Sequence, residues 1–220
     1  MGFDKPHHDD LLDGAALRHE LTALAQEVKD NHLRKAALAL IKARFSDARL
    51  CVKGDVESGK WDGERAAQAL SHIQDTLIQV LYDFATKHVY YAQNPTTAER
   101  MAIVATGGYG RAMLAPGSDV DLLFIRPFKE TAWGESVIEF ILHMLWDLGL
   151  KVGHATRSVA ECIRLSRQDI TIRTALLEAR FLWGDRAVFD DMRKKFWADV
   201  ASRAGPDFVE AKLAERDQRH

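Results

Sequence analysis

Apolar residues recur at spacings of three and four along most of the first hundred positions, a pattern typical of amphipathic helices. One such stretch covers Leu11–Val52, with a polar interruption near Asp30. We expect it to form one long helix, or two helices joined at that interruption. A second apolar stripe covers Glu64–Tyr91 and predicts another helix, for which Asp62 is a suitable N-cap.

The apolar pattern changes after these helices. Two short runs, Ile103–Ala105 and Leu122–Ile125, have the length of buried strands, and a glycine-rich turn and a polar connection join them. A helical stripe follows over Thr131–Leu148, and Leu150–Thr156 predicts a third strand. This order predicts a small mixed sheet with helices on one side.

Past the third strand the pattern predicts helices only. Ser158 and Glu161 form a capping pair that opens a short helix, as Thr96 and Glu99 do before the first strand. Longer helices are expected over Asp169–Trp183, over Asp185–Arg203 and from Phe208 onward.

The expected fold is therefore α+β, with a small mixed sheet between two helical regions. We place the N-terminal helical region at residues 1–94, the core that holds the sheet at residues 95–158, and the C-terminal helical region at residues 159–220. The first ten residues, which include His7 and His8, are polar and are expected to be loose and solvated.

Two carboxylates open the second apolar run. Asp119 and Asp121 are separated by the apolar Val120, and in a strand alternate side chains point to the same face. Both acids would then project together, where two like charges repel. A divalent cation neutralises such a pair, and Mg²⁺ suits carboxylate ligands because it keeps its other positions for water and phosphates. The pair is therefore a candidate metal site and a candidate catalytic site.

The glycine pair after the first strand is a candidate nucleotide-binding turn. Gly107 and Gly108 lie between the two predicted strands. Glycine allows positive φ, and it lets an anion approach main-chain N–H groups without a Cβ in the way. We expect Gly108 to use both properties, so that a β-branched residue there would obstruct a phosphate.

Composition limits the class of protein. The 220 residues are 47% hydrophobic and 28% charged, with a net charge of −2 and a pI near 6.5, values that argue against a dedicated nucleic-acid binder. Two distant cysteines, Cys51 and Cys162, have no metal-binding spacing, so the cytoplasm is the expected compartment. No long apolar run or signal-peptide pattern is present, and a membrane is not expected as a partner.

The order of strand, Gly-Gly, ten residues and Asp-apolar-Asp resembles the signature of nucleotidyltransferases of the DNA polymerase β type. A narrower resemblance runs from about Ala98 to Gly184. Three strings, GGYGRAMLAPGSDVDLL, LWDLGLKVGHATRS and TALLEARFLWG, are similar to the N-terminal part of bacterial PII-protein uridylyltransferase/uridylyl-removing enzymes. The general signature does not require the second and third strings, so this resemblance is specific.

The resemblance implies transfer of UMP from UTP to a tyrosine of the PII signalling protein, with one or two Mg²⁺ ions. By position, Gly107 and Gly108 would bind the UTP phosphates, while Asp119 and Asp121 would ligate Mg²⁺ and support catalysis. Members of that family also remove UMP and sense glutamine through further domains. Glutamine would therefore act through sequence that this chain lacks.

Some roles stay open at the level of sequence. Arg111 and Ser118 are candidate phosphate contacts, and Arg157 is a weaker one. The superfamily usually carries a third carboxylate on a neighbouring strand, but the predicted third strand has no acid, and His154 stands where one would be sought. Glu178 is a further acid whose simplest role is structural. The group that takes the tyrosine proton is unassigned.

Rival functions share the same glycines and carboxylates. One is an adenylyltransferase of glutamine synthetase, and another is a nucleotidyltransferase that acts on a small molecule. A third is a regulatory module that binds a nucleotide without catalysis, an alternative that the absence of a third acid keeps open.

Overall fold

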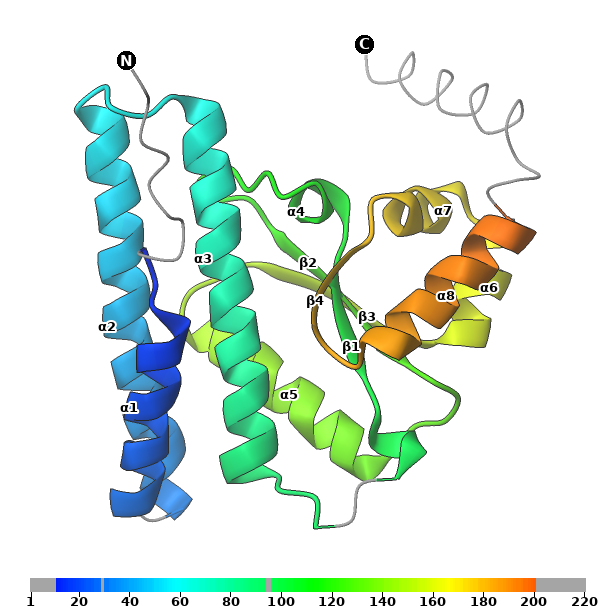
Figure 1. Ribbon diagram of the computed structural model, residues 1–220, viewed down its shortest axis with the longest axis horizontal. Helices are drawn as coiled ribbons and strands as arrows, with labels where there is room; N and C mark the ends of the chain where they lie inside the picture. The colour runs from blue at the N-terminus through cyan, green and yellow to red at the C-terminus, as the bar shows by residue number, and fades with distance from the viewer. Residues whose placement is uncertain (1–10, 29, 94–95, 201–220) are drawn as a thin grey trace.

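A computed structural model describes residues 11–28, 30–93 and 96–200 of the chain (Figure 1). The polar segment 1–10 and the helix expected from Phe208 lie outside the described residues.

Three long helices form the first part of the fold. α1 spans Gly14–Glu27, α2 spans Asp30–Glu57 and α3 spans Gly63–Phe84. The first apolar stretch thus forms two helices joined at its polar interruption. The predicted N-cap of α3 is confirmed, because the Asp62 carboxylate accepts a hydrogen bond from the Arg65 N–H at 2.8 Å.

Four strands form one mixed sheet in the order β3-β2-β1-β4. Their bounds are Ala102–Ala105 for β1, Val120–Arg126 for β2, Val152–Ser158 for β3 and Arg180–Gly184 for β4. β1 pairs antiparallel with both β2 and β4. β2 pairs directly and in parallel with β3, and the helix α5, Ala132–Asp147, connects the two strands along the chain. The three predicted strands and the mixed sheet are confirmed.

The prediction of a single helix over Asp169–Trp183 is wrong. α7 covers only Ile170–Leu177, and the chain then enters β4. β4 pairs with the edge of β1 that β2 leaves free, a long-range contact that outweighs local helical periodicity. Gly184, with φ of +90°, lets this segment pass against the Met101 carbonyl. The sheet therefore extends beyond residue 158.

The bounds of the remaining elements are Ala85–Val89 for η2, Thr97–Glu99 for η3, Gly107–Gly110 for α4, Val159–Gln168 for α6 and Arg186–Asp199 for α8. Both predicted capping pairs are confirmed. Thr96 with Glu99, and Ser158 with Glu161, form reciprocal capping boxes.

Helices pack on both faces of the sheet, which corrects the expectation of helices on one side. One core joins α1, α2, α3 and α5 to Ile103, Leu122 and Phe124. The other joins α6, α7 and α8 to Val104 and Leu123. Alternate strand residues point to opposite faces, so each strand contributes to both cores. Figure 1 shows α1–α3 on one side of the sheet and α6–α8 on the other.

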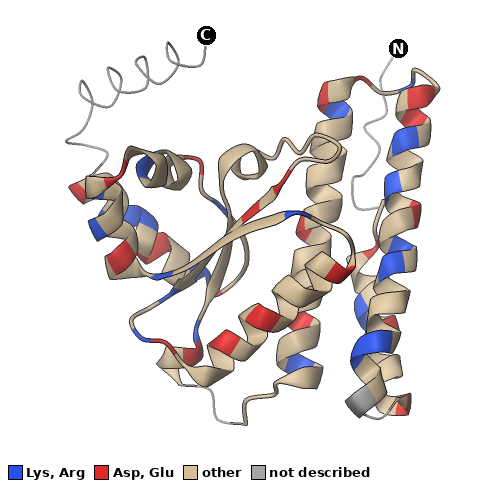
Figure 2. Ribbon diagram, turned by 180° about the vertical axis from the view of Figure 1, so that it is seen from behind, with Lys and Arg blue, Asp and Glu red and all other residues tan. Residues whose placement is uncertain are grey.

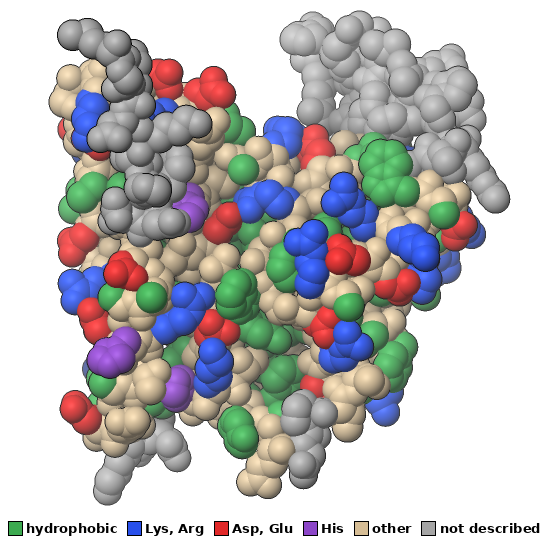
Figure 3. Space-filling view, viewed as in Figure 1, with side chains coloured by type: hydrophobic (Ala, Val, Ile, Leu, Met, Phe, Trp, Pro, Cys, Tyr) green, Lys and Arg blue, Asp and Glu red, His purple; other side chains and the backbone are tan. Residues whose placement is uncertain are grey.

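Charges of both signs are mixed over the surface. Figure 2 shows Lys and Arg interspersed with Asp and Glu along the outer helices, and Figure 3 shows the same mixture on one face. None of the described helices combines the length and the apolar character that crossing a membrane requires.

Candidate active site

The paired carboxylates lie at the beginning of β2. The strand starts at Val120, so Asp121 belongs to it and Asp119 immediately precedes it, a small correction to the expectation that both acids lie in the strand. Val120 is buried between them, Asp121 is half-buried and Asp119 is exposed. Burial raises the pKa of Asp121, and repulsion from Asp119 adds to this rise. The two acids are therefore close enough to interact.

Two glycines make room for the Asp121 carboxylate. Gly107, with φ of +59°, approaches so closely that a Cβ there would lie 3.0 Å from Asp121 Oδ2. Gly153 is the register partner of Asp121 on β3, and a Cβ there would lie 2.4 Å from Asp121 Oδ1. Any other residue at Gly153 would displace the carboxylate. Sequence reasoning missed Gly153, because only the β2–β3 register brings it to the acid.

Gly108 has a different environment from the one expected. Its φ is not positive, and a Cβ there would lie 3.7 Å from both Arg111 Nη2 and the Met113 carbonyl, at ordinary contact distance. The expectation of positive φ at Gly108 is therefore wrong, and Gly107 is the glycine that requires it. The turn itself, α4, lies directly beside β2, because the Thr106 N–H donates to the Asp121 carbonyl at 3.0 Å.

A partly buried network of hydrogen bonds holds α4 against α3 and β4. The Tyr109 hydroxyl donates to Asp75 Oδ1 at 2.7 Å, and Arg180 Nη1 reaches Asp75 Oδ2 at 2.5 Å. Arg180 also donates to the Tyr109 carbonyl at 3.1 Å and to the Gly110 carbonyl at 3.3 Å. Burial, with the neighbouring Asp75, raises the pKa of Tyr109 well above its ordinary value. The glycine turn is thus fixed by one carboxylate and one guanidinium.

A cleft of about 710 Å³ opens beside Asp121, between the sheet and α7. Gly107, Arg111 and Arg157 line it, together with Glu178 at the end of α7. Arg111 Nη1 and Glu178 Oε1 form an ion pair at 2.7 Å, so the arginine expected to meet phosphate has a carboxylate partner in the structure. Glu178 joins the cleft because the chain turns into β4 directly after it, which the predicted long helix concealed.

Ser118 lies away from the cleft, and His154 is one of the residues that line the cleft although its ring is turned away from Asp121. Ser118 is exposed and lines a separate cavity on the other face of β2. His154 pairs in register with Leu122, and its ring lies against Trp146 of α5 with centroids 6.1 Å apart. His154 therefore points to the α5 face, and the β3 position that faces Asp121 is Gly153.

The residues present fit a hard divalent cation bound by two carboxylates. Among the described residues, no cluster of three or more His, Cys, Asp or Glu side chains forms a complete protein cage for a metal. Mg²⁺ does not need one, because one or two carboxylates with substrate phosphates and waters complete its octahedron. Space for such ligands exists, since glycines stand on two sides of Asp121.

The known proteins that this chain resembles are nucleotidyltransferases. Residues 4–140 match the family model described as glutamate-ammonia ligase adenylyltransferase. Proteins named bifunctional uridylyltransferase/uridylyl-removing enzyme are 51% identical in Rhodospirillum rubrum over 96% of this chain, 49% in Bradyrhizobium diazoefficiens over 98%, and 47% in Rhodopseudomonas palustris over 100%. The chain spans 22%, 23% and 24% of the lengths of these three relatives.

The match to the family model covers more than half of the chain and includes the glycine turn and both carboxylates. The chain therefore belongs to the nucleotidyltransferase family of the glutamate-ammonia ligase adenylyltransferases, and over almost its whole length it is similar to one part of the bifunctional uridylyltransferase/uridylyl-removing enzymes.

Proposed function

We propose that this chain is the nucleotidyltransferase part of an enzyme that transfers UMP from UTP to a tyrosine of the PII signalling protein. The observation that carries the proposal is the half-buried Asp121, which stands beside Asp119 and between two glycines at the wall of an open cleft. The names of the relatives support UMP as the group transferred. Glutamine would act through parts of the enzyme outside this chain, and the cytoplasm is the proposed compartment.

The proposed roles follow from position. Asp119 and Asp121 would hold Mg²⁺, which when bound neutralises charge on the phosphates and on the leaving group. Gly107 and Gly108 would leave the main chain of α4 open to the triphosphate. Arg111 would exchange its Glu178 partner for a phosphate, since both are negatively charged oxygen ligands.

The reaction needs little covalent help from the protein. A tyrosine oxygen forms a bond to the α-phosphorus of UTP, the bond from that phosphorus to the bridging oxygen breaks, and pyrophosphate leaves with the electron pair. The phenolic proton passes to an acceptor, and no residue of this chain is assigned to that role. The task of the cleft is to hold the two oxygens in line with the phosphorus and to stabilise the charge that develops.

The decisive experiment supplies each of the four labelled nucleoside triphosphates, with Mg²⁺, to the protein together with PII or glutamine synthetase. The expected product is UMP-labelled PII. Asp119→Asn and Asp121→Asn should each lower transfer by about 10²-fold or more, because an amide does not supply the charge that the metal requires. Asp147→Asn, at an exposed ion pair with Arg34, is the matched control and should transfer normally. Near-normal transfer by Asp119→Asn or by Asp121→Asn would contradict the proposed role of these carboxylates.

Adenylyl transfer to glutamine synthetase is the second candidate function, because the description of the matching family model names that activity. It predicts AMP-labelled glutamine synthetase in the same assay. Labelling of an aminoglycoside, supplied as the acceptor in a further assay, would indicate a nucleotidyltransferase that acts on a small molecule. Tight nucleotide binding without transfer to any acceptor would favour a regulatory module. The division into regions 1–94, 95–158 and 159–220 also remains a proposal.

A further inference from the structure

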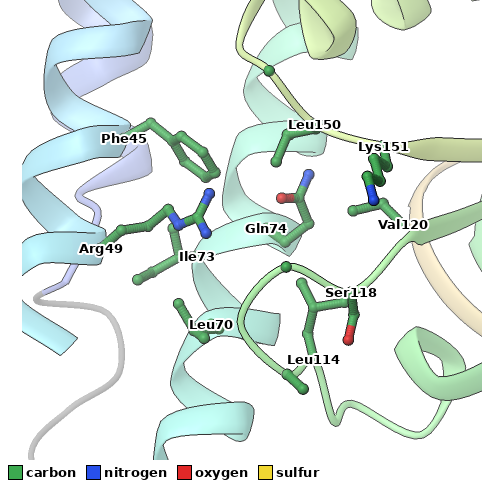
Figure 4. Close-up of a pocket in the computed structure, with 13 residues that line it drawn as sticks. Phe45, Arg49, Leu70, Ile73, Gln74, Leu114, Ser118, Val120, Leu150 and Lys151 are labelled. Carbon is green, nitrogen blue, oxygen red and sulfur yellow. The ribbon is translucent and has the colours of Figure 1, made fainter. Parts of the chain in front are cut away.

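A second cavity, of about 130 Å³, lies on the face of β2 opposite the cleft. We call it the rear cavity. Its walls come from α2, α3, the loop before β2, Val120 of β2 and the loop before β3 (Figure 4). Val120, which points away from the carboxylates, contributes to its lining, whereas Asp121 and Arg157 do not. The rear cavity is therefore separate from the proposed nucleotide site.

The amide nitrogen of a buried glutamine at the rear cavity has no hydrogen-bond partner among the described residues. Gln74 of α3 is 1% exposed, and its Nε2 has no hydrogen-bond partner among the described residues. Figure 4 shows the Gln74 amide between the side chains of Arg49 and Lys151, which approach from opposite walls. An unpaired buried donor is unfavourable in a folded protein, so such a group calls for an explanation.

The charged and polar side chains of the rear cavity are all able to donate hydrogen bonds. Arg49 and Lys151 bring two positive charges, Gln74 an amide and Ser118 a hydroxyl, and no Asp or Glu is among the lining residues. Within the described part of the chain neither Arg49 nor Lys151 forms an ion pair, although the Arg49 guanidinium lies 5.4 Å from the centre of the Phe45 ring. The cavity thus has a positive charge that the lining residues do not neutralise.

We propose that the rear cavity binds a small oxyanion, either a short carboxylate or inorganic phosphate. An oxyanion accepts hydrogen bonds from guanidinium, ammonium and amide groups at once, and bonds to charged donors are the stronger kind. The volume is close to that of a protein cavity of about 150 Å³ that holds benzene, so a ligand of about six non-hydrogen atoms fits. Apolar side chains such as Ile73 and Leu150 would contact a short aliphatic tail.

The ligand would contact the back of the segment that carries the acidic pair. Ser118 precedes Asp119, and Val120 lies between the two carboxylates, so both neighbours of Asp119 line the rear cavity. Lys151 is also joined to this segment, because its carbonyl accepts a hydrogen bond from the Val120 N–H at 2.8 Å.

The test follows the side-chain amide of Gln74 by ¹H–¹⁵N NMR on the full chain, with the signal assigned by its loss in Gln74→Met. Sodium phosphate and sodium propionate are titrated separately, against sodium chloride at equal ionic strength. The Gln74 signal should shift with at least one of the two oxyanions and not with chloride. The oxyanion that produces the shift identifies whether phosphate, carboxylate or both are accepted.

Variants separate the rear cavity from the cleft. Arg49→Gln and Lys151→Gln should each weaken the oxyanion-dependent shift by about tenfold or more in ligand concentration. Arg111→Gln removes a cleft cation instead and should leave the Gln74 titration unchanged. The proposal is overturned if neither oxyanion moves the Gln74 signal, if chloride moves it equally, or if Arg49→Gln and Lys151→Gln both titrate like the unaltered protein.

Discussion

At the scale of single residues, the space around Asp121 depends on the absence of a side chain at Gly153. Gly153→Ala would place a Cβ 2.4 Å from Asp121 Oδ1, and the carboxylate must then move because β3 is held by its pairing with β2. We expect the affinity for Mg²⁺–UTP to fall by about tenfold or more, as when the support of a metal ligand is lost. Calorimetry with UTP and Mg²⁺ measures the change.

Gly54→Ala is the matched control for this substitution. Gly54 lies in α2, where an added Cβ would meet no atom within 4 Å, and its φ is not positive. Alanine should therefore stabilise the helix by about 0.5–1 kcal/mol and leave nucleotide binding unchanged. Equal affinities of Gly153→Ala and Gly54→Ala for Mg²⁺–UTP would show that the close approach to Asp121 has no role in binding.

Cys162 supplies a prediction about pH. Its thiol is buried on α6, and burial raises its pKa to about 12, whereas an unfolded thiol titrates near about 8.5. Between these values the unfolded chain loses a proton that the folded chain keeps, so stability falls as the pH rises from about 8.5 toward 12. Tyr82, whose pKa burial also raises to about 12, adds to this decline from about pH 10.

Urea unfolding at pH 8 and at pH 10 tests the role of this thiol. The decrease in unfolding free energy between the two pH values should be larger in the unaltered chain than in Cys162→Ala, which has no thiol at that position. Cys51 is exposed and serves as an internal control, because Cys51→Ala should leave the decrease unchanged. Identical decreases in all three proteins would contradict the prediction.

Residue-level reasoning from sequence succeeded where the relevant partners are close along the chain. Asp119, Asp121 and Gly107 lie within one strand–turn–strand segment, so their proximity follows from local spacing. Gly153 and Glu178 join the same cleft through the β2–β3 register and through the end of α7. The sequence pattern around Gly153 or around Glu178 does not predict these contacts with distant residues.

At the scale of elements, Arg180 connects β4, α4 and α3. Its guanidinium is the ion-pair partner of Asp75, whose side chain is only 17% exposed. Arg180→Gln would leave that carboxylate without its positive partner, and we expect a loss of about 2 kcal/mol in unfolding free energy. This corresponds to a decrease in Tm of roughly 4–8 °C for a chain of this size. Thermal unfolding followed by circular dichroism measures the decrease.

Lys195→Gln provides the comparison, since Lys195 forms an exposed pair with Asp191 within α8. Such a surface pair contributes little, and Tm should change by roughly a degree or less. Because Arg180 also holds the glycine turn, Arg180→Gln should weaken nucleotide binding at temperatures where the protein is still folded. Similar Tm values for the two variants would exclude a structural role for the Arg180–Asp75 pair.

Elements that depend on interactions between residues close along the chain were predicted correctly, and the element that depends on a distant partner was not. Capping boxes and helical stripes are local, and the sequence predicted Asp62, Thr96 and Ser158 as caps correctly. β4 depends on pairing with β1, about eighty residues earlier in the chain. Phe181 packs against Phe189 of α8, so the apolar residues that were interpreted as a helical stripe are buried by a strand and a later helix.

At the scale of the whole molecule, one chain supplies the Asp121 carboxylate, two glycines and two arginines that line the cleft. We therefore expect the 220-residue chain alone to bind Mg²⁺–UTP, although it spans less than a quarter of the Rhodospirillum rubrum relative. Calorimetry should give a saturable signal that Asp121→Asn abolishes. A flat titration with the unaltered chain would show that the site needs residues from the rest of the enzyme.

The position of β1 in the sheet also determines how the protein unfolds. This strand of four residues is buried along its whole length, lies between β2 and β4, and contributes alternate side chains to the two cores. Neither layer of helices can separate from the sheet without exposing one face of β1 to water. Opening of either side is therefore linked to opening of the other. The β1 amides should be among the last in the chain to exchange their hydrogens with solvent, at a rate set by global unfolding.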